Sequence, residues 1–252
     1  MSVEGPFRRA HHNRIHKVLS GLDIPFFREN RLLFCGGTLV SLMHHEFRHS
    51  NDIDLIPDPS FRGYRALRER VSGDASVLFD SVPDGVRLGE PGCDQYGVRF
   101  AAFVDECPIK FAIFQEARLD FLQPGMEVPE LPVLCLAPED QMVEKLLANT
   151  ERGMDPSVRH RDLYDLAMLG LDNINPGAAI ERANRAYDVE RSLDKLLNLL
   201  LTDTQRRVDD MEALEIDREY RPRVVDGLEV LAGFRGLDLV AERPPWEEDI
   251  RL

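Results

Sequence analysis

Residues 32–56 read LLFCGGTLVSLMHHEFRHSNDIDLI, and the order of elements in this stretch decides the fold. The apolar run at 32–35 stops at two glycines, which is typical of a buried strand that ends in a turn. A helix is expected over residues 38–47, with the threonine at its start as the cap. Residues 52–56 alternate polar and apolar side chains and precede Pro57, as a strand does. The stretch therefore predicts strand, glycine turn, helix and strand in succession.

Two carboxylates leave the second predicted strand on one face. Asp52 and Asp54 are two residues apart, and side chains at that spacing on a strand point to the same side of the sheet. Carboxylate oxygens suit Mg²⁺ or Mn²⁺, and paired ions can clamp the attacking and leaving oxygens in nucleotidyl transfer. The Gly36–Gly37 turn before a helix lets backbone N–H groups approach a phosphate. Each feature alone also fits a plain turn and an exposed edge strand.

The rest of the first half is predicted to alternate helices with short strands. The expected elements are a helix over 8–28, a helix over 60–72 and strands near 76–80, 97–104 and 109–115. Residues 105–108, DECP, separate the last two strands and are typical of a hairpin turn.

A proline-rich connection, PGMEVPELPVLCLAP at 124–138, ends this half and carries a short predicted strand at 133–136. Beyond it the pattern becomes helical, with helices expected over 139–152 and 158–171 and two or three more within 176–235. We therefore predict the α+β class: a mixed sheet flanked by helices in a domain of residues 1–137, followed by a mainly helical domain of residues 138–252.

The composition narrows the possible partners. The chain of 252 residues carries a formal net charge of −14, whereas proteins that hold nucleic acid by neutralising phosphates are usually basic. Any nucleic-acid contact must therefore use a local patch, and the arginines at 62, 65, 68 and 70 or at 152, 159 and 161 are candidates, although such runs are often solvated helix faces. The polar start of the chain, the scattered cysteines and the lack of an apolar run of about 18 residues favour a cytoplasmic protein without a membrane span.

A resemblance to a known family rests on two groups of residues. The chain resembles the nucleotidyltransferases of the AbiEii/AbiGii toxin family, a branch of the polymerase-β-like superfamily. The resemblance lies in the succession of a strand, Gly-Gly-Thr, a helix and then the pattern RxSxDxD at 48–54. The resemblance continues in PED at 138–140, in Lys145 and in RDLYDL at 161–166, because such proteins carry a lysine helix followed by an Arg/Lys-Asp-x-x-Asp-Leu helix. It covers roughly residues 30–170 and implies that the mixed sheet is nucleotidyltransferase-like.

The resemblance implies an activity and a set of roles. The expected reaction is Mg²⁺- or Mn²⁺-dependent transfer of a nucleotidyl group from an NTP to a hydroxyl of an RNA, possibly a tRNA, or of a protein. The protein would be the toxin of a toxin–antitoxin or phage-defence pair, with a cognate antitoxin as partner. The roles implied are metal binding by Asp52 and Asp54, triphosphate contact by Gly36, Gly37 and Thr38, and support of the loop or the phosphates by Arg48 and Ser50. Lys145 would neutralise phosphate charge, and Asp162 would orient the lysine or act as base, although the two could also form an ordinary ion pair.

One expected group is missing from the sequence. The superfamily usually supplies a third carboxylate from a later strand, and the best counterpart, IKFAI at 109–113, has Ala112 at that position. Asp105, Glu116 or Asp120 could substitute for it, but none of the three fits the register. The alternatives are altered chemistry, reliance on Asp162, or a non-catalytic protein that binds nucleotide without turning it over.

The same stretch also contains the spacing of a zinc peptidase. His45-Glu46-x-x-His49 would place two imidazoles on one helical face, with Glu69 as a conceivable third ligand. That motif needs a continuous helix, whereas a strand pattern follows at once, so we favour polar residues at a helix end. The histidines at 11, 12 and 16 are expected to be exposed, and the leucine-rich run at 193–201 is expected to be the core face of a helix rather than a binding groove.

Overall fold

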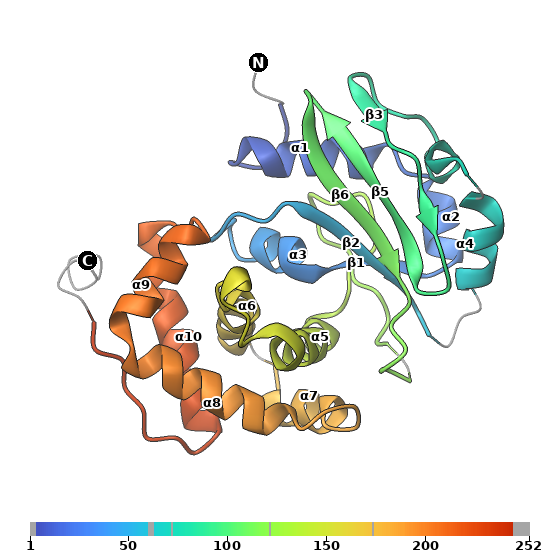
Figure 1. The fold of residues 1–252 in the computed structure, drawn as a ribbon. Helices are drawn as coiled ribbons and strands as arrows, with labels where there is room; N and C mark the ends of the chain where they lie inside the picture. The colour runs from blue at the N-terminus through green and yellow to red at the C-terminus, as the bar shows by residue number, and fades with distance from the viewer. Residues whose placement is uncertain (1–3, 60–62, 72, 121, 173, 244–252) are drawn as a thin grey trace. The chain divides into compact units, whose positions relative to one another are not determined.

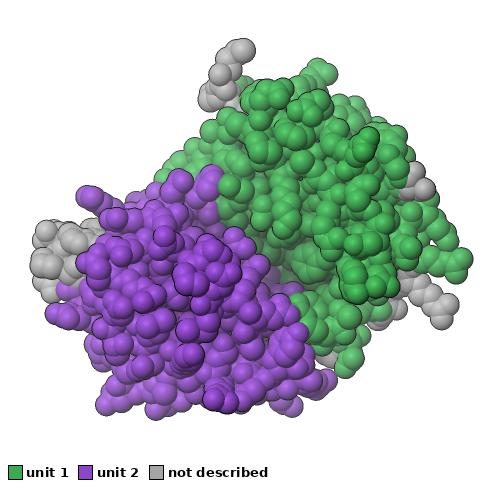
Figure 2. Space-filling view, viewed as in Figure 1, with its two compact units in different colours: residues 1–46, 50–137 green, residues 47–49, 138–252 purple. Residues whose placement is uncertain are grey.

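The chain forms two compact units, shown in different colours in Figure 2. The computed structural model describes residues 4–59, 63–71, 73–120, 122–172 and 174–243. The first unit comprises residues 1–46 and 50–137, and the second comprises residues 47–49 and 138–252. None of the helices in the described ranges combines the length and the apolar character that a bilayer crossing needs.

A mixed sheet forms the centre of the first unit (Figure 1). Its strands follow the order β1-β2-β6-β5-β3, and β4 pairs with β5. The pair β2–β6 is parallel, and the other pairs are antiparallel. The strands are β1 (Leu32–Cys35), β2 (Asp52–Pro57), β3 (Val86–Leu88), β4 (Gly92–Cys93), β5 (Gly97–Val104) and β6 (Cys107–Phe114). The predicted α+β class with a mixed sheet is confirmed.

The two faces of this sheet differ in character. Alternate residues along β2 and β6, such as Ile53 and Phe111, are fully buried and form the core face. The residues between them point to the opposite face, where Asp52 and Asp54 are half-buried and Lys110 is exposed. The core face stabilises the sheet by apolar burial, and the opposite face carries these charged side chains together with buried apolar ones such as Ala112 and Ile56.

The helix predicted over residues 8–28 is wrong, because the chain forms two helices there, α1 (Ala10–Ser20) and α2 (Ile24–Glu29). The Asp23 carboxylate accepts a hydrogen bond of 3.0 Å from the N–H of Phe26 and so caps α2. Pro25 lies in the first turn of α2, where its missing N–H removes no helical bond. The polar cap and the proline therefore start a new helix.

Two predicted strands are also wrong. The segment predicted as a strand at 76–80 is largely a 3₁₀ helix, η1 (Ala75–Leu78), whose first N–H groups are capped by Asp74 through a bond of 2.8 Å to Ser76. The strand predicted at 133–136 is reduced to single bridges from Cys135 to Phe34 and Met126. The proline-rich sequence around that segment limits longer pairing, because proline has no N–H to donate.

The other predictions for the first unit agree more closely with the structure. Asp105 and Glu106 form the two-residue turn of the β5–β6 hairpin. Their φ values of 49° and 60° are both positive, as a type I′ turn requires. Helix α4 (Gly63–Val71) lies within the helix predicted over 60–72, of which residues 60–62 and 72 lie outside the described residues.

The second unit is helical, as expected, but residues 176–235 contain four α-helices rather than two or three. Its helices are α5 (Pro138–Arg152), α6 (Arg161–Gly170), α7 (Pro176–Ala183), α8 (Val189–Thr202), α9 (Thr204–Ala213) and α10 (Arg221–Phe234), with 3₁₀ turns η2 (Pro156–Val158) and η3 (Arg218–Tyr220) (Figure 1). Leu193, Leu196 and Leu197 are buried, so the leucine-rich run is a core face. Gly227 lets α10 approach α6, because a Cβ atom there would lie 2.1 Å from the Ala167 carbonyl oxygen.

The segment Phe47–His49 belongs to the second unit although it lies between α3 (Gly36–Met43) and β2 in the sequence. The N–H of His49 donates to the Leu214 carbonyl at 3.2 Å, and the N–H of Asp217 donates to the Phe47 carbonyl at 3.1 Å. These backbone bonds hold the segment against the turn that follows α9.

Candidate active site

The glycine turn lies directly beside one of the predicted metal ligands. Gly36 has a φ of +81°, and a Cβ atom added to it would lie 2.8 Å from Asp54 Oδ2. Both the backbone conformation and the available space therefore require glycine at this position. Helix α3 begins here, so the N–H groups of its first turn, including that of Gly37, have no partner within the helix.

Thr38 connects the start of α3 to the strand that carries the aspartates. Its hydroxyl oxygen lies 2.6 Å from the carbonyl oxygen of Asp52 and 2.9 Å from the hydroxyl of Ser50, and the side chain is only 1% exposed. Thr38 was expected to cap α3, but it lies in the third position of that helix. Its hydroxyl and that of Ser50 fix the position of β2 relative to the glycine turn.

The register of the sheet defines the surroundings of the two aspartates. In the parallel pair β2–β6, Asp52 is opposite Lys110 and Asp54 is opposite Ala112. Ala112, which is 4% exposed, therefore stands on the neighbouring strand beside a predicted metal ligand. Of the three possible substitutes, Asp105 lies in the hairpin turn and Glu116 forms an ion pair with Arg118.

The residues present fit one magnesium or manganese ion. Mg²⁺ in proteins is commonly bound through one or two carboxylates, with phosphate oxygens and water completing the octahedron. Asp52 and Asp54 offer that donor set from one half-buried face. No group of three or more His, Cys, Asp or Glu side chains that could hold a metal ion occurs in the described part of the chain, so a cage of three carboxylates is not built here.

A buried ion cluster lies within the second unit. Lys145 on α5 is 5% exposed, and its ammonium lies 3.0 Å from Asp162 Oδ1 and 2.6 Å from Asp165 Oδ2, both on α6. Arg48 donates two hydrogen bonds of 2.7 Å to the two oxygens of Asp165. Arg152 donates bonds of 2.6 and 2.9 Å to Asp162. Three cations thus share two carboxylates, and the cluster carries one net positive charge.

The cluster fixes the charge of its members. Burial acts to raise the pKa of Asp162, but Lys145 and Arg152 outweigh it and hold this pKa well below its usual range. Burial likewise acts to lower the pKa of Lys145, but the carboxylates of Asp165 and Asp162 raise it. Asp162 is therefore a carboxylate at neutral pH with very low basicity, which suits orientation of Lys145 better than proton transfer.

The predicted site residues fall into these two groups. Gly36, Gly37, Thr38, Ser50, Asp52 and Asp54 come together in the first unit, and Arg48, Lys145 and Asp162 come together in the second. Arg152, which was predicted only as part of a basic patch, and Asp165, which was predicted only as part of the run at 161–166, also belong to the second group. The sequence held a signal for Asp165, because residues three apart on a helix lie on the same face as each other.

The zinc-peptidase interpretation is wrong. Helix α3 ends at Met43, and His45 and Glu46 both have φ of 58°, so the motif does not lie on a helix. The Glu46 carboxylate accepts bonds from the N–H groups of Arg8 and Arg9 at 2.6 and 2.9 Å and contacts His12 Nδ1 at 2.7 Å. His12 was expected to be exposed, but it is fully buried, and burial lowers its pKa to about 4 in spite of Glu46.

The first predicted basic patch is partly neutralised. Arg65 forms an ion pair of 2.8 Å with Glu69, and Arg70 forms one of 2.6 Å with Asp23. Arg62 lies outside the described residues. In the second predicted patch, Arg152 binds the buried carboxylate described above.

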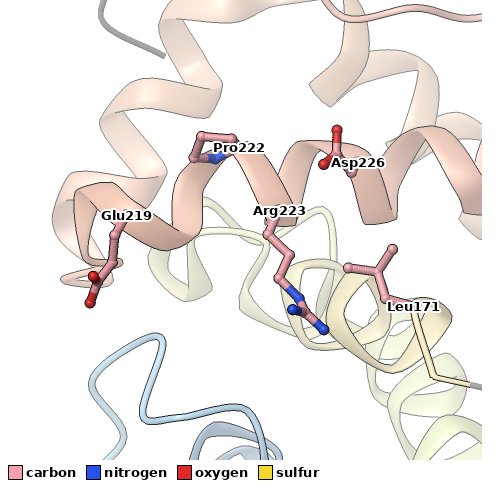
Figure 3. A pocket seen from close by; sticks show the side chains of 5 residues that line it. All are labelled: Leu171, Glu219, Pro222, Arg223 and Asp226. Carbon is pink, nitrogen blue, oxygen red and sulfur yellow. The ribbon is translucent and has the colours of Figure 1, made fainter. Parts of the chain in front are cut away.

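A surface pocket of the second unit is separate from the ion cluster. It has a volume of about 470 Å³ and is lined by Leu171, Glu219, Pro222, Arg223 and Asp226. Figure 3 shows that η3 and α10 supply four of these side chains and that Leu171 approaches from the end of α6. None of the predicted site residues lines it.

The fold and the glycine turn beside paired aspartates define a nucleotidyltransferase-like protein. A family model described as the nucleotidyl transferase AbiEii toxin of type IV toxin–antitoxin systems matches residues 17–233. The chain therefore belongs to this family, and the resemblance seen in the sequence is confirmed. Membership implies an antitoxin partner, and nucleotidyltransferases generally use a divalent metal ion and an NTP.

Comparison with solved structures finds matches along most of the chain at low sequence identity. A protein from H. pylori described as a candidate nucleotidyltransferase superposes with a TM-score of 0.50 and 14% identity, covering 95% of this chain and 94% of that chain. JHP933 from Helicobacter pylori gives a TM-score of 0.49 at 14% identity, covering 95% and 91%. An antigenic nucleotidyltransferase-like protein from Paracoccidioides brasiliensis gives 0.46 at 13%, covering 84% and 96%. No curated protein matches the chain.

Proposed function

We propose that this protein transfers a nucleotidyl group from an NTP to a hydroxyl of an RNA or a protein, with Mg²⁺ or Mn²⁺ bound by Asp52 and Asp54. The observation that carries the proposal is the contact between the glycine turn and the aspartate face. A Cβ atom added to Gly36 would lie only 2.8 Å from Asp54 Oδ2, so the first N–H groups of α3 lie close to the oxygens proposed to bind the metal ion. One triphosphate could therefore use both at once.

The residues of the first unit divide the work of holding the nucleotide. The N–H groups at Gly36, Gly37 and Thr38 bind triphosphate oxygens, and the positive end of the α3 dipole favours the negative charge. The Thr38 hydroxyl already bonds to β2, so this residue acts on phosphate through its backbone. A bound metal ion supplies charge neutralisation at the phosphate oxygens.

The reaction is a displacement at the α-phosphorus. The acceptor oxygen forms a bond to that phosphorus, the bond from the α-phosphorus to the oxygen that bridges to the β-phosphate breaks, and pyrophosphate leaves with its electron pair. The hydroxyl proton passes to water. Asp162 does not take it, because Lys145 and Arg152 hold the pKa of this carboxyl far below that of an effective base.

In the second unit, the role that the resemblance implies belongs to the lysine of the ion cluster. Lys145 would neutralise phosphate, with Asp162 and Asp165 holding its ammonium in one orientation. Arg48 takes a supporting role, because its Nε and Nη2 donate to Asp165 and its Nη1 donates to the His49 carbonyl inside the protein.

A second candidate function is nucleotide binding without turnover. Ala112 favours it, because the side chain beside Asp54 on β6 offers no oxygen to a metal ion or a proton. In that case the protein would bind NTP and metal as proposed but would form no covalent product.

Label transfer distinguishes the two functions. The purified protein is mixed with each α-labelled NTP, Mg²⁺ or Mn²⁺, and either total tRNA or cell protein, and the acceptor is identified from the labelled fraction. The test variant is Asp52→Ala/Asp54→Ala, and the matched control is Asp80→Ala/Asp84→Ala, which removes two exposed acids of the same unit. Label that persists in the control and vanishes in the test variant supports transfer. Binding of NTP without label in any fraction favours the second candidate.

A further inference from the structure

The face of the sheet that carries the aspartates also carries a lysine. Lys110 is opposite Asp52 in the register of β2 and β6, and its neighbours Ile109 and Phe111 are fully buried on the other face. Hydrogen-bonded strands lie about 4.8 Å apart, and the lysine stem spans a longer distance than that. The ammonium of Lys110 can therefore reach the space in front of the two carboxylates.

Lys110 differs from Arg99, which lies on the same face. Arg99 on β5 is opposite Ala112, and its guanidinium forms an ion pair of 3.2 Å with Asp94. Lys110 forms no ion pair with any residue in the described ranges and is exposed. Its positive charge is therefore available to a ligand, whereas that of Arg99 is compensated by Asp94.

Ala112 and Lys110 together change the charge of the face. With a third carboxylate at position 112, three negative charges would lie beside the ammonium of Lys110. With Ala112, only two carboxylates lie beside this ammonium, and the Arg99–Asp94 pair adds no net charge, so a second divalent ion would approach the ammonium with one carboxylate fewer to bind it. The charge balance thus favours one metal ion and one fixed ammonium.

We propose that the active site binds a single divalent ion through Asp52 and Asp54, and that the ammonium of Lys110 takes the place of a second ion by contacting the triphosphate of the NTP. This inference rests on the proposed nucleotide site. It assigns Lys110 to substrate binding and explains how the site can function with Ala112 beside Asp54.

Two binding measurements test the assignment without relying on turnover. Mn²⁺ binding is followed by electron paramagnetic resonance and by calorimetry, and binding of each NTP is followed by calorimetry. Wild-type protein is expected to bind one Mn²⁺ at the site, with the ion lost in Asp52→Ala/Asp54→Ala. Lys110→Ala is expected to weaken NTP binding by about tenfold to a hundredfold, as for loss of a hydrogen bond to a charged group.

The same variant is expected to bind Mn²⁺ about twofold to tenfold more tightly, because the repulsive ammonium is gone. Lys110→Arg is expected to restore NTP binding, and Lys195→Ala, which removes an exposed lysine of α8, is expected to change neither affinity. Opposite shifts for the two ligands in one variant would not follow from a merely structural role.

Ala112→Asp supplies the converse test, since it is expected to add a second Mn²⁺ site. If this variant fails to fold because position 112 is buried, the number of Mn²⁺ ions bound by the wild-type protein and the affinities of the Lys110 variants still test the inference. Two Mn²⁺ ions in wild-type protein, or unchanged NTP affinity in Lys110→Ala, would overturn the inference while label transfer could still succeed. Absence of label with the expected binding shifts would instead overturn the proposed transfer and leave this assignment standing.

Discussion

Removal of Asp165 should destabilise the second unit strongly. This carboxylate is fully buried and accepts two bonds from Arg48 and one contact of 2.6 Å from Lys145. Asp165→Asn keeps the shape of the side chain but removes the carboxylate that Arg48 and Lys145 share. Asp162 is then the one carboxylate left in the cluster. Breaking a buried ion pair by removing one partner costs about 3–5 kcal/mol, and we expect a loss of unfolding free energy in this range.

The matched control is a surface pair of the same unit. Arg206 contacts Asp203 at 3.2 Å with both side chains more than 40% exposed. Arg206→Met should therefore change the unfolding free energy by no more than about 1 kcal/mol. The comparison separates the effect of losing a buried partner from that of losing any ion pair.

A double-mutant cycle makes the test quantitative. Arg48→Met, Asp165→Asn and the double variant are unfolded in urea, and hydrogen exchange of α5 and α6 reports on the second unit by itself. Because the two side chains bind each other directly, the double variant should be more stable than the sum of the single effects by at least about 2 kcal/mol. Additive single effects, or a loss for Asp165→Asn as small as that for Arg206→Met, would refute the reasoning.

Three further expectations follow from the geometry. Gly36→Ala should lower the affinity for Mn²⁺ and for NTP at least about tenfold, because backbone strain at φ +81° and a contact of 2.8 Å from the new Cβ would displace the Asp54 carboxylate. Gly233→Ala is the control, because its Cβ would meet nothing within 4 Å, and it should change neither affinity. Calorimetry measures both affinities in the two variants. The stability that Asp162 contributes through its depressed pKa should be present above about pH 4 and should fall as the pH drops below that value. Urea unfolding at several pH values measures this, and the unfolding free energy of Asp162→Asn should depend less on pH than that of the wild-type protein. The same pH dependence in both proteins would contradict the ion cluster. Iodoacetamide at pH 8 should modify the exposed Cys93 and spare Cys135, since burial raises the pKa of the Cys135 thiol to about 12. Mass spectrometry of the peptides measures the modification of each cysteine, and faster modification of Cys135 than of Cys93 would contradict the prediction.

The local patterns of the sequence predicted the elements that depend on local chemistry. The strand, glycine turn and second strand within 32–56 follow from apolar runs and alternation, and the structure has β1, the start of α3 and β2 there. The family follows from the same residues together with Lys145 and the run at 161–166, and the family match confirms it. The α+β class needed only the change from alternation to helical periodicity near residue 137.

Some of the failures have long-range causes, whereas the break of the first helix and the loss of the strand at 76–80 come from the local caps of Asp23 and Asp74. Helix α3 was expected to continue to Phe47, but His45 and Glu46 turn into the left-handed region while Glu46 binds the N–H groups of Arg8 and Arg9. These partners lie more than 30 residues away, so no local pattern could reveal them. The burial of His12 has the same origin, because its ring meets Glu46. The roles of the site residues themselves remain predictions, to be tested by the binding and label-transfer experiments.

The excursion of Phe47–His49 into the second unit has a consequence for any attempt to divide the protein. The chain passes between the units at residues 46–47, 49–50 and 137–138, so no single cut yields one fragment for each unit. A fragment of residues 1–137 would retain Arg48 but lose Asp165, leaving a guanidinium without the carboxylate that binds it. We expect such a fragment to be insoluble or partly unfolded.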